Sequence, residues 1–201
     1  MDHYYTDNEN TKDEPCQVDF EIDGHTFLLQ SNAGVFSSHK LDSGTRILLD
    51  TVLEHQPKPE SVLDLGAGIG IVGVVCSYFW KCKVIGVEVS SRAADLARTN
   101  YERNKVDGEV LHQDGTNLDN LGTYECVLIN PPIRAGKSVV YAMLEQGAKH
   151  LTESGSMWVV MRKQHGAQSA MKHLQQLGYE VERVARDLGF WILRVQKGKD
   201  A

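Results

Sequence analysis

The tetrapeptide Asn130-Pro131-Pro132-Ile133 has the most distinctive chemistry in the chain. Each proline has a fixed φ and forces the residue before it into extended geometry, so the Asn130 side chain and the Pro131 carbonyl become stiffly held acceptors. An amino nitrogen attached to a ring has a delocalised lone pair, and two oxygens that grip its hydrogens can turn that lone pair toward an electrophile. We therefore predict catalysis by orientation of an amine. The structural alternative is an ordinary turn.

A glycine-rich segment, Val62–Gly70, predicts the cofactor. Its glycines are spaced G-x-G-x-G, and Ile71 stands where a dinucleotide fingerprint has its third glycine, which disfavours NAD. Asp64 precedes the glycines, where a carboxylate repels a pyrophosphate but attracts a cationic amino acid. S-adenosyl-L-methionine carries an ammonium and a sulfonium and no phosphate, so the segment favours it.

Two further acidic residues follow predicted strands. Glu88, followed by Val89, ends the segment KVIGVEV, where an acceptor can take both ribose hydroxyls of a nucleoside. Asp114, followed by Gly115, can accept a hydrogen from the adenine amino group or can simply form a turn.

Basic residues gather at the same predicted edge. Arg134 and Lys137 follow the tetrapeptide, and Arg162 and Lys163 follow another strand. They either hold phosphates next to a target base or are solvated loop cations. The net charge of −6 is unfavourable for nucleic acid, but residues 1–15 account for −4 of it, so the remainder can carry a local basic patch.

The elements that must position these residues begin with a polar segment, 1–15, which predicts a flexible tail. Alternating apolar residues on either side of Asp23-Gly24 predict a hairpin. Asp42 or Ser43 can cap a helix that ends before Pro57. We expect residues 16–57 to form a cap of hairpin and helix.

Residues 58–201 alternate between strand and helix, which predicts a Rossmann-like α/β core with helices on both faces of a mostly parallel sheet. The short link RDLG near the end makes an antiparallel pair, so we expect seven strands with one reversed. Strands are predicted at SVLDL, KVIGVEV, EVLHQ, YECVLIN, SMWVVM, YEVERVA and GFWILRVQ, and helices from about residue 69, over 91–104, from 138 and over 167–177.

Composition favours one domain, 16–201, in the cytoplasm. The longest nearly apolar run, Ile71–Trp80, is about half of the roughly 20 residues that a membrane span needs, and the N-terminus lacks a secretory signal. The four cysteines form no C-x-x-C pair, which predicts reduced thiols, and the scattered histidines predict no metal site.

The chain resembles the class I methyltransferases of the small-domain type, and among them the small-subunit (16S) ribosomal RNA guanine-N2 methyltransferases. The matching segments are DHYY, SNAGVFSSHKLDSGTRILL, VLDLGAGIGIVG and INPPIRAGK. The resemblance implies a class I methyltransferase fold, an S-adenosyl-L-methionine cofactor, and ribosomal RNA or a small-subunit particle, not DNA, as the partner. It implies that Asn130 and Pro131 are catalytic. The resemblance also implies cofactor contacts at Asp64, Gly66, Gly68, Glu88, Asp114, Phe36 and Gly44. Together with the position of the motifs at the predicted edge, the full set of predicted cofactor contacts is Asp64, Gly66, Ala67, Gly68, Gly70, Glu88, Val89, Asp114, Gly115, Asn130, Phe36 and Gly44, and the predicted substrate contacts are Pro132, Ile133, Arg134, Lys137, Arg162 and Lys163.

Two departures from the family pattern shape the expectations. Many amino methyltransferases have an aromatic residue that stacks on the base where this chain has Ile133, so Phe36 is the predicted stacking partner. Larger relatives carry an additional domain for which 201 residues leave no room. The alternatives are a protein glutamine N5-methyltransferase and a nonenzymatic S-adenosylmethionine-binding module. The sequence leaves open whether the protein is a monomer or a homodimer.

Overall fold

The computed structural model describes residues 14–33, 35 and 40–198. Most of the predicted tail therefore lies outside the described residues. Its boundary at residue 15 is wrong, because Pro15 already pairs with Asn32. A proline is tolerated there because it is the first residue of an edge strand and has no amide hydrogen to donate.

The elements follow the predicted order with small changes at their ends. The strands are β1 (Pro15–Ile22), β2 (His25–Asn32), β3 (Ser61–Leu65), β4 (Lys83–Glu88), β5 (Gly108–His112), β6 (Tyr124–Ile129), β7 (Leu151–Arg162), β8 (Tyr179–Asp187) and β9 (Phe190–Lys197). The helices are α1 (Ser43–His55), α2 (Ile71–Trp80), α3 (Ser91–Arg103), α4 (Lys137–Lys149) and α5 (Ala167–Gln176), with 3-10 turns η1 (Ile133–Ala135) and η2 (Lys163–His165).

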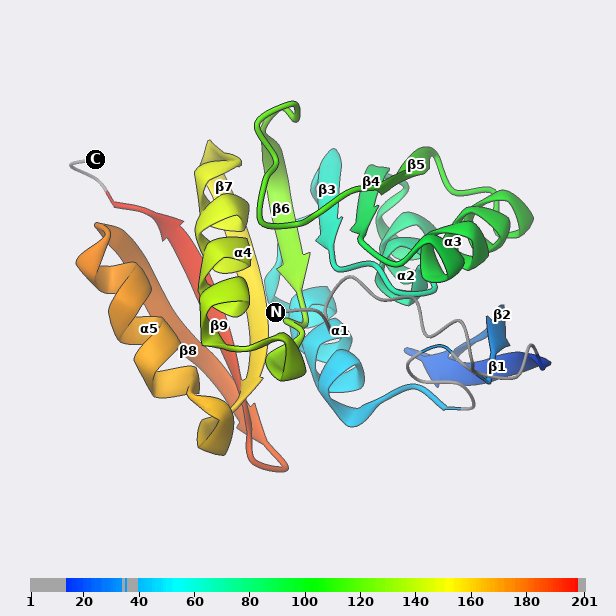
Figure 1. Cartoon of the computed structure of the whole chain (residues 1–201), viewed down its shortest axis with the longest axis horizontal. Coiled ribbons are helices and arrows are strands. Elements are labelled where there is room, and N and C mark those ends of the chain that lie inside the picture. Colours follow the sequence, from blue (N-terminus) through cyan, green and yellow to red (C-terminus); the bar gives the residue numbers. More distant parts are fainter. Residues whose placement is uncertain (1–13, 34, 36–39, 199–201) are drawn as a thin grey trace.

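The central sheet has seven strands in the order β5-β4-β3-β6-β7-β9-β8 (Figure 1). The neighbours from β5 to β7 pair in parallel, and β9 is antiparallel to both β7 and β8. The predicted sheet with one reversed strand is confirmed. Because β3 and β6 are adjacent and parallel, their carboxyl ends place the glycine segment beside the tetrapeptide.

The two faces of the sheet form two apolar cores. Alternate strand residues point to opposite faces, and Val62 and Leu63 of β3 belong to different cores, both fully buried. The first core contains the buried residues of α1, α2, α3 and the β1–β2 hairpin, and the second those of α4 and α5. Helix α1 therefore packs on one face of the sheet, and the N-terminal hairpin packs on the same side against α1 and α3.

Two element boundaries differ from prediction for backbone reasons. The helix expected from about residue 69 begins at Ile71, because Gly70 precedes it with φ of 90°. β7 extends from Leu151 rather than from Ser156, because Leu151 pairs with Tyr124 before the register shifts. Neither change moves the predicted site residues.

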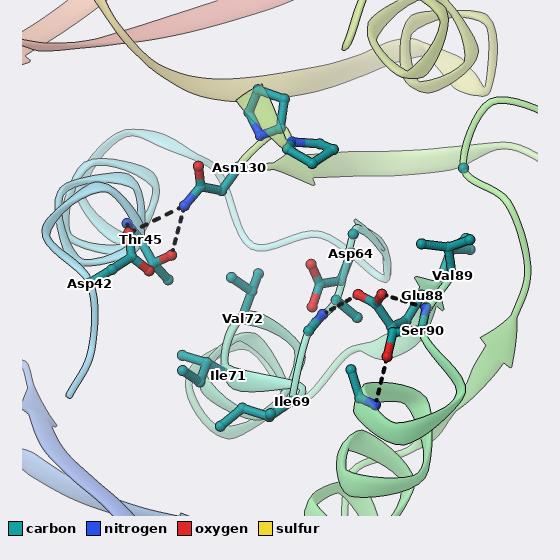
Figure 2. Close-up of a pocket in the computed structure, with 18 of the residues that line it drawn as sticks. Asp42, Thr45, Asp64, Ile69, Ile71, Val72, Glu88, Val89, Ser90 and Asn130 are labelled. Atoms are coloured by element: carbon teal, nitrogen blue, oxygen red, sulfur yellow. Dashed lines mark hydrogen bonds between the residues drawn. The ribbon is translucent and has the colours of Figure 1, made fainter. Parts of the chain in front are cut away.

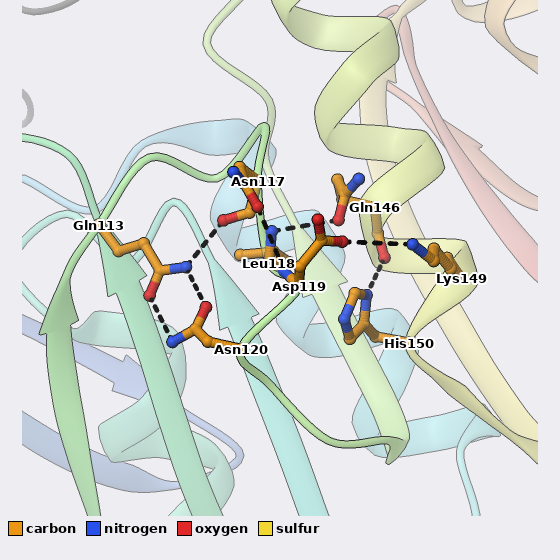
Figure 3. A network of polar contacts seen from close by, with 8 residues as sticks. All are labelled: Gln113, Asn117, Leu118, Asp119, Asn120, Gln146, Lys149 and His150. Carbon is orange, nitrogen blue, oxygen red and sulfur yellow. Dashed lines mark hydrogen bonds and ion pairs between the residues drawn. The ribbon is translucent and has the colours of Figure 1, made fainter.

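The link between β5 and β6 contains no helix and is held by polar side chains (Figure 3). The Gln113 side-chain amide donates to the Asn117 carbonyl at 2.7 Å and to Asn120 Oδ1 at 2.6 Å. The Leu118 amide donates to Gln146 Oε1 of α4 at 3.1 Å. These contacts fasten the link to α4 and fix the position of Gly115.

Three cysteines, Cys76, Cys82 and Cys126, are buried and Cys16 is half-buried, all as free thiols. None of the described helices is long and apolar enough to cross a membrane. In the described ranges, no three His, Cys, Asp or Glu side chains come together in a way that could hold a metal ion.

Candidate active site

A cavity of about 760 Å³ opens at the carboxyl ends of β3, β4 and β6 (Figure 2). Asp64 and Glu88 line it from strands, and the Asn130-Pro131-Pro132 segment lines it from the end of β6. The structure therefore brings the glycine segment, the ribose candidate and the tetrapeptide to one space, as expected for a parallel α/β sheet.

The glycine turn after β3 is shaped by left-handed backbone. Gly66 and Gly68 have φ of 82° and 55°, and the amides of Gly66 and Ala67 both donate to the Val87 carbonyl at 2.9 Å. A Cβ atom on Gly68 would meet no protein atom within 4 Å. Glycine thus allows this backbone and leaves the space above it open for a ligand.

Glu88 is held rigidly at the end of β4. Its Oε2 accepts the Gly68 amide at 2.7 Å and its Oε1 accepts the Ser90 amide at 2.9 Å. A carboxylate has about four acceptor positions, so both oxygens keep capacity for further donors. The side chain therefore fits a vicinal diol such as a ribose.

Asp64 is a buried carboxyl group, 3% exposed, that still touches the cavity. Burial raises its pKa from the ordinary 3.8 to about 7; the Gly73 amide, which donates to Oδ2 at 3.3 Å, lowers the pKa and nearby Glu88 raises it. A cationic ligand next to this carboxyl would favour its ionised form and so offset the cost of burying the charge.

We expect S-adenosylmethionine affinity to fall as the pH drops below about 7, because Asp64 then loses the charge that attracts the ammonium. The fall approaches about tenfold per pH unit. The free energy of unfolding has the opposite dependence. Ionising a carboxyl whose pKa is raised in the folded chain destabilises the fold, so this destabilisation is absent below about pH 4 and complete above about pH 7. Calorimetry from pH 5.5 to 8.5 measures the affinity. Asp64→Asn should remove the pH-dependent part, and an identical pH profile in this variant would contradict the assignment.

The Asn130 amide is fixed by helix α1. Its Nδ2 donates to Thr45 Oγ1 at 3.1 Å and to Asp42 Oδ1 at 3.3 Å. A carboxylate only accepts, so the Asn130 nitrogen must face Asp42 and the amide cannot be reversed. Asp42 also caps α1 by accepting the Thr45 amide at 3.0 Å. Figure 2 shows the Asn130 nitrogen turned toward this helix end.

Asn100 connects the N-terminal hairpin to the glycine turn. Its buried side chain donates to the carbonyls of Gln30 at 2.9 Å and Ile69 at 2.8 Å, and its oxygen accepts the Gln30 amide at 2.7 Å. The N-terminal hairpin therefore supports the glycine turn that lines the cavity.

Most of the predicted residues line this cavity. The lining includes Asp64, Gly66, Ala67, Gly68, Glu88, Val89, Gly115, Asn130, Pro131, Pro132, Ile133 and Arg134. The predicted residues that are not in its wall are Gly44, Gly70, Asp114, Lys137, Arg162 and Lys163. Phe36, the predicted stacking partner, lies outside the described residues.

Local contacts explain several of these exceptions. Asp114 accepts the Thr116 amide at 2.9 Å, which is the turn-forming role that competed with adenine binding. Gly44 lies against the Phe190 ring, which would be 3.0 Å from an added Cβ. The Arg162 guanidinium lies over that ring at 4.2 Å, and Lys137 lines a smaller neighbouring cavity of about 170 Å³.

Sequence reasoning missed several residues that the fold adds to the wall: Asp42, Thr45, Ser90, Arg92, His165 and Phe190. Asp42 was visible only as a helix cap and Phe190 only as a strand residue. Phe190 and His165 offer ring surfaces at the cavity, the kind of contact assigned to Phe36 from the sequence.

The family model described as the methyltransferase small domain matches residues 26–194 of the chain. The chain belongs to the methyltransferase small-domain family. Its cofactor is S-adenosyl-L-methionine, and the open glycine turn and the fixed Glu88 carboxylate fit that molecule.

Individual relatives of this methyltransferase fall into two length classes. It is 36% identical to an uncharacterized protein, YbxB, of Bacillus subtilis, over 98% of both chains. It is 32% identical to ribosomal RNA small subunit methyltransferase C of Vibrio cholerae over 71% of this chain, but the match covers only 42% of that protein. The fold resembles a T. thermophilus 16S rRNA N2 guanine methyltransferase in complex with AdoMet and guanosine, with a TM-score of 0.80, 22% identity, and coverage of 92% of this chain and 51% of that one.

Proposed function

We propose that this methyltransferase transfers a methyl group from S-adenosylmethionine to the exocyclic amino nitrogen of an RNA base, namely guanine N2 of small-subunit ribosomal RNA. The observation that carries the proposal is the Asn130 amide, which is locked by Asp42 and Thr45 in the wall of the cofactor cavity. The relatives named for ribosomal RNA methylation support the substrate class.

S-adenosylmethionine, when bound, supplies a methyl group on a sulfonium that an amine can take by direct in-line displacement. Glu88 would hold the ribose hydroxyls, and Asp64 would attract the ammonium of the amino acid end. In the described part of the chain, Asn130 Oδ1 accepts no hydrogen bond, so it is available for a substrate N–H. The Pro131 carbonyl accepts the other hydrogen.

The protein then acts mainly by orientation. Gripping both hydrogens turns the nitrogen lone pair out of conjugation and toward the methyl group. The carboxylate of Asp42 strengthens the effect, because a charged acceptor on the amide N–H polarises the amide and makes Oδ1 a better acceptor. The surplus proton leaves to water.

The proposal is tested by incubating the purified protein with methyl-labelled S-adenosylmethionine and either naked ribosomal RNA or small-subunit particles. Digestion to nucleosides should place the label in N2-methylguanosine. Label in a glutamine side chain of a small-subunit protein would instead support the protein methyltransferase alternative.

We expect Asp42→Ser combined with Thr45→Val to lower kcat on the order of tenfold, with little change in S-adenosylmethionine affinity. Serine still caps α1 but is too short to reach Asn130 as well, and valine removes the second acceptor at constant shape. The Asn130 amide is then free to reverse. Steady-state kinetics with thermal unfolding measures the effect.

Thr45→Ser keeps the hydroxyl and is the matched control, with expected parental turnover. If the double variant kept parental kcat, or lost kcat only in proportion to folded protein, helix α1 would not position Asn130.

A further inference from the structure

The turn between β8 and β9 has an unusual residue at its tip. Leu188 and Gly189 have φ of 46° and 80°, so both central residues of this two-residue turn are left-handed. Such turns favour Asn-Gly or Asp-Gly, because a larger side chain is disfavoured in left-handed backbone. Leucine therefore occupies a position for which its backbone preference is poor.

Leu188 is also badly placed for stability. It is 68% exposed, the highest fraction among the large apolar side chains in the described residues. A leucine in water adds nothing to the core. A leucine that is both in left-handed backbone and exposed to water contributes no stability that would explain it, which indicates a functional position.

The turn is anchored at the rim of the active-site cavity. Arg162 Nη1 donates to the Leu188 carbonyl at 3.4 Å, and the Lys163 amide donates to the Gly189 carbonyl at 3.0 Å. The next residue, Phe190, lines the cavity. In Figure 1 the turn projects at the lower edge, toward which the arrow of β6 also points.

The surroundings suit a nucleic acid. Exposed Lys163 and Arg186 and half-buried Arg162 flank the turn, with Asp187 as the acidic neighbour in sequence. A base that enters the cavity must leave its stack, which exposes the face of the adjacent base. An apolar side chain held on a rigid turn can cover that face.

We propose that Leu188 is a wedge that packs against the RNA base next to the target nucleotide and keeps the target out of its stack. This inference rests on the proposed RNA substrate. It adds a substrate contact from the β8–β9 turn, outside the cofactor cavity.

The test is Leu188→Asn, assayed on a structured RNA fragment and on an unstructured oligonucleotide that contain the same target. Asparagine suits left-handed backbone, so the melting temperature should stay equal or rise. KM for the structured RNA should rise on the order of tenfold, because one apolar wedge contact with an exposed base is lost, with a smaller change for the unstructured oligonucleotide. The dissociation constant of S-adenosylmethionine should not change.

Leu177→Asn is the matched control, because Leu177 is 51% exposed and lies at the end of α5 remote from η2. It should leave both KM values at the parental level. An unchanged KM for structured RNA in Leu188→Asn, or an equal rise in Leu177→Asn, would overturn the wedge. Failure of the parental protein to methylate either RNA would overturn the proposed function instead.

Discussion

Asn130→Ala is expected to lower kcat by on the order of tenfold to a thousandfold, while the dissociation constant of S-adenosylmethionine stays within about threefold of the parental value. The side chain is assigned to the substrate amine, and its contacts with α1 hold it in place rather than hold the cofactor. Its loss therefore removes an interaction that matters when the amine is aligned for attack. Single-turnover kinetics separates this step from product release.

A paired exchange sharpens this test. Asn130→Asp alone places a second carboxylate next to Asp42, which removes the N–H that Asp42 accepts and adds repulsion. In the double variant Asp42→Asn with Asn130→Asp, the new asparagine can cap α1 and donate to the new aspartate. We expect the double variant to recover part of the activity that Asn130→Asp loses. Parental turnover in Asn130→Ala would mean that the tetrapeptide is only a turn.

Glu88→Ala is expected to weaken S-adenosylmethionine binding on the order of a hundredfold, because it removes an ionised acceptor for two ribose hydroxyls. It also leaves the Gly68 and Ser90 amides without their acceptor, so the glycine turn loses support. Glu88→Gln should give a smaller loss, since one of these two amides would face an NH₂ group. Calorimetry with S-adenosylmethionine and its demethylated product measures both variants.

Glu102→Ala, an exposed carboxylate on α3, is the control and should bind as the parent does. Parental affinity in Glu88→Ala would withdraw the ribose assignment, whatever the fate of the Asn130 assignment. The two predictions thus test the cofactor half and the substrate half of the cavity separately.

The sequence predicted the sheet well because its signals are local. Apolar runs, turn residues and the glycine spacing each report on a few neighbouring positions, and the carboxyl-edge rule for parallel strands then places Glu88 and Asn130 together. The hairpin around Asp23-Gly24 and the Asp42 cap of α1 were likewise predicted from a few neighbouring residues.

The contacts that complete the site could not be predicted in this way. Asp42 and Asn130 are 88 residues apart in the chain, and their hydrogen bond depends on how α1 packs against the sheet. Phe190 reaches the cavity only because β9 pairs antiparallel with β7, which brings its first residue opposite Arg162. Hydrophobic periodicity contains no information on either distance. Asp114 is the opposite case: the sequence favoured a ligand contact, but its side chain accepts the Thr116 amide in a local turn and does not line the cavity.

Methylation of an amino group of an RNA base is tested most directly by nucleoside mass spectrometry. Ribosomal RNA would be compared from the parental strain, a strain that lacks this gene, and that strain carrying either the parental gene or Asn130→Ala. We expect one N2-methylguanosine of the small subunit to be missing without the gene, restored by the parental gene and not restored by Asn130→Ala. Identical methylated nucleosides in all four strains would contradict the claim.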